Sequence, residues 1–354
     1  MMIVDRVENR YNEGMNKKAL LGVGALFLII IIGFLLKNGV MLGSPPKVVP
    51  EKVYHVGILS GLDFFGTTVD GFKEGMTELG YIEGKNIIYD VQKSGIDQER
   101  YRAVTKKFVA DKVDMIFVFP TEASLEAKAA VAGTDIPVVF VANIEGVNLI
   151  ESIREPGNNI TGVSLAGPDV AVRRLEMLHE LAPHATKFFV PFLKGYPIIP
   201  PELAVLEPAA KALGVTLEEF PAASPDEIAT KLASLGSVKG AKVGAIFMIV
   251  EPLTLDPNIF PLLGKFAAEQ HIPLGGAYVT MGGYTSVFGI FPENIAFGKQ
   301  AAALANKIFK GVPAGSIPVV TAEPKSYLNY DLAQTLGLTM TEEFLTKVDH
   351  IIRK

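Results

Sequence analysis

The 354-residue sequence contains no cysteine. Without thiols the folded chain can form no disulfide bonds and must be held together by its core, and a lipid-modified cysteine anchor is excluded. Stretches rich in lysine and arginine are also missing, and the formal net charge is -5. Because the phosphate backbone of nucleic acids calls for a basic surface, this charge balance argues against a nucleic-acid partner.

Motifs for metal, nucleophilic and phosphate chemistry fail on their spacing. His179 and His184 lie five positions apart across a proline, whereas the helical zinc motif needs two histidines four apart. In Gly162–Gly167 the second glycine comes one position too late for a nucleophile elbow. We therefore expect no metal, no cofactor and no enzymatic activity, and an α/β enzyme acting on a small molecule is the weaker alternative.

A long apolar run, Ala19–Leu36, carries no charge. As a helix its eighteen residues would extend roughly 27 Å, close to the thickness of the hydrocarbon core of a bilayer. The bulky residues that follow do not form the small-residue cleavage site of a secretory signal, so we expect an uncleaved transmembrane anchor, with a cleaved signal as the alternative. Basic residues before the run predict a cytoplasmic N-terminus and an extracytoplasmic body.

Three N-terminal segments follow from this run. We expect a cytoplasmic tail in residues 1–18, the anchor in residues 19–36 and a linker in residues 37–52. Within the tail, Met15 resembles a natural start of the chain. The proline-rich part of the linker, Gly43–Pro50, predicts a short extended spacer. We expect the globular fold to begin near Val53.

From that point β-rich runs alternate with amphipathic helices. Tyr54–Leu59 predicts a strand, and Gln98–Ala110 predicts a helix. Val113–Phe119 is an apolar run typical of a strand that is buried on both faces. The alternation predicts an α/β fold with parallel sheets covered by helices on each side.

An internal similarity indicates that the chain contains two such units. Val113–Pro120, followed by a helix and Ile136–Phe140, has the same layout as Val243–Val250, followed by a helix and Ile272–Gly275. Two similar α/β lobes are therefore expected.

Several segments resemble a known family. Pro156–Ser164 resembles the PGxNxTGxS segment of ABC-transporter substrate-binding proteins, in the uncharacterised or tryptophan/tyrosine-binding group. Ala209–Val215 is similar to the AAxxLG helix end of that family, and Gly282–Gly289 to its GGxxSYG stretch. The segment from Ala301 to Leu338 is similar to the family's C-terminal helix and the KGxxPxxxPV and NxxTAxxLGL patterns. In this order the matches span nearly all of residues 53–350.

The resemblance implies the type I periplasmic-binding-protein fold, in which two Rossmann-like lobes are joined by a three-strand hinge and close over a small ligand. We expect residues 53–165 to form lobe 1, residues 166–290 lobe 2, and residues 291–354 the return to lobe 1 with the C-terminal hinge and helices. The chain departs from the family in its apolar span and in Phe288, which stands where tyrosine is usual and puts the ligand assignment in doubt.

The implied function is that of an extracytoplasmic, membrane-anchored binding protein of an ABC importer. It would capture a small amino-acid-like ligand, with an aromatic side chain as one option, and pass it to a permease driven by a separate ATPase. A ligand-sensing subunit that signals to a partner membrane protein is the alternative.

Candidate ligand residues follow from the geometry of open parallel sheets, where ligands bind outside the carboxyl ends of the strands and near helix N-termini. Thr121 could instead cap its own helix, Asp63 could serve a turn, and Phe64 could pack in the core. Asn143, at a strand end, is the foremost candidate. In the first lobe the candidates are Ser60, Leu62, Asp63, Phe64, Thr121, Glu122, Ser124, Asn143 and Ile144, and in the second lobe Lys194, Tyr196, Glu251, Tyr278 and Thr280.

Overall fold

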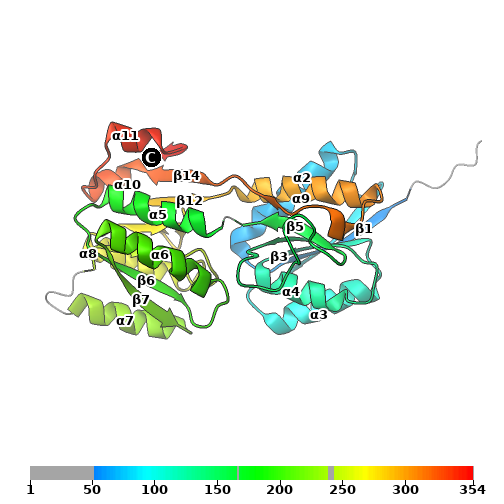
Figure 1. Ribbon diagram of the computed structural model, residues 1–354, viewed down its shortest axis with the longest axis horizontal. Coiled ribbons are helices and arrows are strands. Elements are labelled where there is room, and N and C mark those ends of the chain that lie inside the picture. Colours follow the sequence, from blue (N-terminus) through cyan, green and yellow to red (C-terminus); the bar gives the residue numbers. More distant parts are fainter. Residues whose placement is uncertain (1–51, 166, 238–242, 354) are drawn as a thin grey trace, which may run out of the picture. The chain divides into compact units, whose positions relative to one another are not determined.

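The computed structural model describes residues 52–165, 167–237 and 243–353. The expected tail, anchor and linker fall almost wholly outside these ranges. No helix within the ranges combines the length and the apolar character needed to cross a membrane. The described part of the chain contains two large sheets, each covered by helices (Figure 1).

The first sheet has six parallel strands in the order β13-β5-β4-β3-β1-β2. α2 and α9 pack together over one face, and α3 and α4 pack together over the other (Figure 1). The elements are β1 (Tyr54–Ser60), η2 (Asp63–Phe65), α2 (Gly66–Glu78), β2 (Ile87–Lys93), α3 (Gln98–Ala110), β3 (Met115–Phe119), α4 (Thr121–Ala130), β4 (Val138–Ala142), β5 (Ile160–Ser164), α9 (Asn294–Phe309), η3 (Ala314–Ser316) and β13 (Val320–Thr321).

β3 shows why an uninterrupted apolar run forms a central strand. Met115, Phe117 and Phe119 belong to the hydrophobic cluster that includes α2 and α9, whereas Ile116 and Val118 belong to the cluster formed with α3 and α4. All five side chains are fully buried. Since successive strand residues point to opposite faces, a sheet covered on both sides requires apolar residues at every position.

Glycines allow α2 and α9 to approach closely, although they lie far apart in the sequence. A Cβ atom at Gly71 would overlap the carbonyl oxygen of Ile295, and one at Gly298 would overlap the carbonyl oxygen of Thr68. Larger residues at either position would force the helices apart. α9 thus completes the cover of the first sheet.

The second sheet has seven strands in the order β15-β14-β12-β9-β8-β6-β7. All neighbouring pairs are parallel except β12 and β14, which are antiparallel. The elements are α5 (Pro168–Leu181), β6 (Lys187–Leu193), α6 (Ile199–Leu213), β7 (Thr216–Ala222), α7 (Pro225–Ser237), β8 (Ala245–Phe247), α8 (Phe260–Gln270), β9 (Leu274–Gly276), β12 (Phe288–Phe291), β14 (Lys325–Asn329), α10 (Tyr330–Thr335), α11 (Glu342–Thr346) and β15 (His350–Ile352), with a separate hairpin of β10 (Thr280–Met281) and β11 (Tyr284–Thr285).

The chain passes between the two sheets three times. It leaves the first sheet after β5 and enters the second through α5, returns from β12 to α9, and crosses again from β13 to β14. One parallel and one mainly parallel sheet, each covered by helices, confirm the predicted α/β class. The three connections bring the carboxyl ends of β5 and β12 next to the other half of the fold.

Candidate functional site

The carboxyl ends of β3 and β4 carry two neighbouring polar side chains. Thr121 begins α4 directly after β3, and Asn143 follows β4. The backbone N–H of Asn143 donates a hydrogen bond to Thr121 Oγ1 at 3.0 Å, and the two residues are 7% and 3% exposed. The N-cap position of α4 is Pro120, so the Thr121 hydroxyl is not the cap of its own helix and instead joins two strand ends.

Tyr196 links this group to the second half of the fold. It follows β6, and its ring packs in the cluster formed by β6, α5 and α6. Its hydroxyl donates a hydrogen bond to Glu122 and accepts one from Thr121. Burial, reinforced by the charges of Glu122 and Glu251, raises the pKa of Tyr196 well above its ordinary value. The phenol is therefore a neutral donor that connects the carboxyl ends of strands from both sheets.

Glu122 retains unused hydrogen-bonding capacity. Its Oε2 is buried and has no hydrogen-bond partner among the described residues. Burial raises the pKa of Glu122, opposed by hydrogen bonds from its own backbone and from Tyr196. A buried carboxylate oxygen without a donor is unfavourable, which makes a donor on a ligand a suitable partner.

Glu251 follows β8 and is held by the backbone. Its Oε2 accepts from the N–H of Leu253 at 2.9 Å and its Oε1 from that of Thr254 at 3.0 Å. Burial raises the pKa of Glu251 to about 8 in spite of these bonds, and the charge of Glu202 adds to the effect. Glu251 therefore contributes a fixed carboxyl group close to Tyr196.

The remaining candidates from the sequence do not gather with this group as ligand-facing side chains. The ring of Phe64 packs against Phe291, with centroids 5.5 Å apart, and Tyr278 stacks on Tyr327 at 5.5 Å. Ser60 is buried at the end of β1 and Leu62 is buried just after it. Ser124 donates to the carbonyl of Pro120, and Ile144 packs on the α3 and α4 cluster. Asp63 and Lys194 are exposed, and Thr280 pairs with Thr285 in the β10–β11 hairpin.

Two charged residues of this region did not stand out in the sequence. Arg174 of α5 is 2% exposed and Glu202 of α6 is 6% exposed. Burial lowers the pKa of Arg174 to about 10. Burial raises the pKa of Glu202 to about 7, against the opposing charge of Arg174. The sequence did contain one indication that Glu202 is buried. It lies four positions before the buried Leu206, so it is a charged residue on the apolar face of α6.

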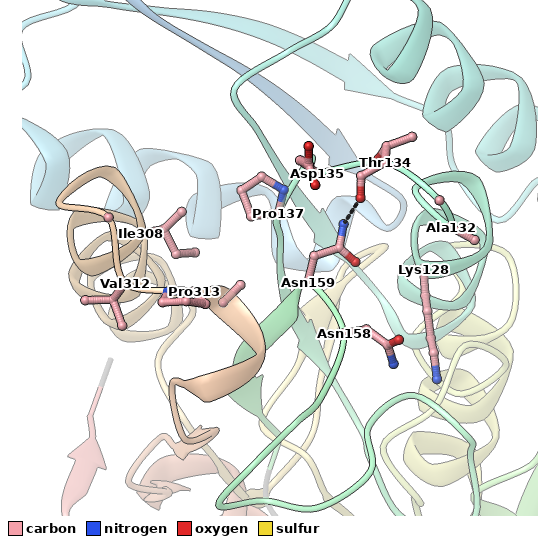
Figure 2. Close-up of a pocket in the computed structure, with 13 residues that line it drawn as sticks. Lys128, Ala132, Thr134, Asp135, Pro137, Asn158, Asn159, Ile308, Val312 and Pro313 are labelled. Carbon is pink, nitrogen blue, oxygen red and sulfur yellow. Dashed lines mark hydrogen bonds between the residues drawn. The ribbon is translucent and has the colours of Figure 1, made fainter.

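A cavity of about 610 Å³ lies elsewhere on the first half of the fold (Figure 2). Its lining includes Pro137 and Asn159, which precede β4 and β5, so it lies at the amino ends of these strands. In the lining of this cavity, Asn159 Nδ2 donates to the carbonyl of Thr134 at 3.3 Å (Figure 2). The C-terminal parts of α4 and α9 border it, and such helix ends offer carbonyls in place of free N–H groups. The cavity is therefore separate from the predicted ligand edge.

Two α/β halves joined by three crossings, with polar groups at the facing strand ends, define a ligand-binding protein of the periplasmic-binding type. Residues 58–352 match the family model described as ABC transporter substrate binding protein. The chain belongs to that family.

Individual relatives agree with this assignment. A tyrosine-binding protein of Clostridioides difficile (strain R20291) is 28% identical over 276 residues, which are 76% of each chain. Among solved structures, an ABC domain from Streptococcus pneumonia in complex with L-Trp matches with a TM-score of 0.76 and 23% identity over 85% of this chain and 100% of that chain. A ligand-free, open substrate-binding protein with adhesive properties from Clostridium difficile matches with a TM-score of 0.62 and 22% identity over the same shares. These structures establish the type I periplasmic-binding fold.

Proposed function

We propose that this protein is the extracytoplasmic binding component of an ABC importer and that it captures an amino-acid-like ligand between the two halves of its fold. The observation that carries the proposal is the contact of Tyr196, from the second half, with Thr121 and Glu122, from the first. A ligand at this position would touch both halves and would therefore favour their closed arrangement over an open one.

An aromatic amino acid fits the proposal best. The tyrosine-binding relative and the L-Trp complex both bear names of aromatic amino acids. Phe288, the departure from the family that put the ligand in doubt, is fully buried and packs against Phe344 with ring centroids 6.3 Å apart. A side chain in this core cluster faces no ligand, so the departure does not argue against an aromatic ligand.

The membrane anchor and the transporter partners form part of the same proposal. The apolar run Ala19–Leu36 and the basic residues before it support a tether that leaves the folded part outside the cytoplasm. Delivery would then require a permease and a separate ATPase.

Calorimetry on the detergent-solubilised full chain tests the ligand. We expect saturable binding of L-tyrosine or L-tryptophan, and weaker binding by Asn143→Ala with an unchanged unfolding transition. If no amino acid binds, and mass spectrometry finds a co-purified compound of another class, the ligand assignment is wrong. Uptake of labelled amino acid should also be lost on deletion, whereas normal uptake would favour the sensing subunit.

A further inference from the structure

Two neighbouring helices of the second half carry buried, opposite charges that do not pair with each other. Arg174 Nε donates to the carbonyl of Ile290 at 2.8 Å. Within the described residues, no carboxylate forms an ion pair with its guanidinium. Glu202 Oε2 is buried and, over the same residues, has no hydrogen-bond partner.

A purely structural pair would look different. α5 and α6 pack against each other, and each charge influences the pKa of the other group. Burial of ionised groups is strongly unfavourable unless they make direct contacts, so a structural pair would be expected to close into an ion pair. Because the described residues hold no ion pair between the two groups, each of them can bind the opposite charge of one small molecule.

The surroundings place this pair where the two halves meet. The charge of Glu145, which follows β4 of the first sheet, raises the pKa of Glu202. The charge of Glu202 in turn raises the pKa of Glu251, which follows β8. A Cβ atom at Gly146 would lie 2.9 Å from the carbonyl oxygen of Pro197 and 3.2 Å from the ring of Pro201. The loop after β4 therefore packs against the start of α6, one turn from Glu202.

We propose that Arg174 binds the carboxylate, and Glu202 the ammonium group, of an α-amino acid. The planar guanidinium can donate two parallel hydrogen bonds to a carboxylate, and the unpartnered Oε2 accepts from the ammonium. Glu145 adds negative charge beside the ammonium from the other half of the fold. The inference rests on the proposed function and specifies its substrate class: a zwitterionic head group, in place of a sugar, a simple amine or a simple acid.

Analogues that lack one charge test each half of the proposal. Calorimetry on the full chain would compare L-tyrosine with tyramine, which lacks the carboxylate, and with 3-(4-hydroxyphenyl)propionate, which lacks the ammonium. We expect the wild type to bind tyrosine about 10- to 100-fold more tightly than either analogue, as expected for charge-assisted hydrogen bonds.

The variants should show matching selectivity. Arg174→Gln should lose about 10- to 100-fold in affinity for tyrosine and little for tyramine, and Arg174→Lys should recover part of the loss. Glu202→Gln should lose a similar factor for tyrosine and little for the propionate. Arg173→Gln and Glu207→Gln remove exposed charges from the same two helices and should bind tyrosine like the wild type.

Two patterns would overturn the inference while leaving the proposed function in place. One is wild-type binding of tyrosine and both analogues with equal affinity. The other is a loss in Arg174→Gln or Glu202→Gln that is equal for tyrosine and for the matching truncated analogue, since this indicates an effect through folding. Failure of the wild type to bind any aromatic amino acid would overturn the proposed ligand class, and this inference with it.

Discussion

Replacing Glu202 with glutamine should stabilise the ligand-free protein above neutral pH. Burial raises the pKa of this carboxyl group from 4.5 to about 7. The folded state therefore holds the proton more tightly than the unfolded state does. As the pH rises from 4.5 to about 7, the unfolded chain releases the proton first, so the free energy of unfolding falls through this window and stays lower above it.

The size of the effect follows from the same values. A difference of about 2.5 pH units at about 1.4 kcal/mol per unit corresponds to about 3 kcal/mol. Glutamine has the same shape and stays neutral, so the variant avoids this loss. Its amide will also lack a partner at the Oε2 position, which costs about 1 kcal/mol or more. The expected net gain at pH 8 is about 1 to 2 kcal/mol.

Urea unfolding of the ligand-free full chain measures this gain. We expect Glu202→Gln to exceed the wild type in free energy of unfolding at pH 8 and to lose the advantage at pH 4.5. Glu207→Gln, on the exposed side of the same helix, should match the wild type at both pH values. The reasoning is refuted if Glu202→Gln is less stable than the wild type at pH 8, or if its advantage is the same at both pH values.

Three further outcomes can be measured on the same protein. The affinity for L-tyrosine should rise between pH 6 and pH 8 because Glu202 ionises in this range. The charged groups that face Glu202 are Arg174, Glu145 and Glu251. Calorimetry on Glu202→Gln should show no such rise. Tyr196→Phe removes a hydrogen bond between the two halves and should weaken tyrosine binding about 5- to 10-fold without unfolding the chain, and wild-type affinity would contradict this role. Gly298→Ala should lower the free energy of unfolding by about 1 to 3 kcal/mol in urea titrations. Gly66→Ala, where nothing lies within 4 Å of the added Cβ, should leave it unchanged. Equal stabilities of the two variants would argue against tight packing of α2 on α9.

Much of the fold could be predicted because the central strands, which helices cover on both faces, have to be apolar at every position. Met115–Phe119 forms β3 at the centre of the first sheet, within the predicted run, since helices cover both of its faces. The predicted strand Val243–Val250 is shorter in the structure, where β8 covers Ala245–Phe247. Strand ends depend on pairing with neighbours, which a single run does not contain.

The candidate site was only partly accessible to the same reasoning. Ligands bind outside the carboxyl ends of parallel strands, and this principle selected Thr121, Asn143 and Tyr196 from the sequence. The structure brings these three residues together. Arg174 and Glu202 lie within helices, and their proximity depends on how α5 packs against α6. Spacing within one helix defines a face, but it does not show which face of another helix will lie opposite.

The glycine contacts between α2 and α9 also have a consequence for how the chain acquires its structure. The hydrophobic surface around Phe72 is covered by α9 residues such as Phe297, and most of the second half of the fold, from α5 to β12, lies between them in the sequence. During synthesis this surface must stay uncovered until almost the entire polypeptide has emerged, because its partner is among the last helices to appear. Because α2 packs against α9 only at this late stage, the chain is expected to stay unfolded while it is being made. An unfolded polypeptide is also the form that can pass through a translocation channel.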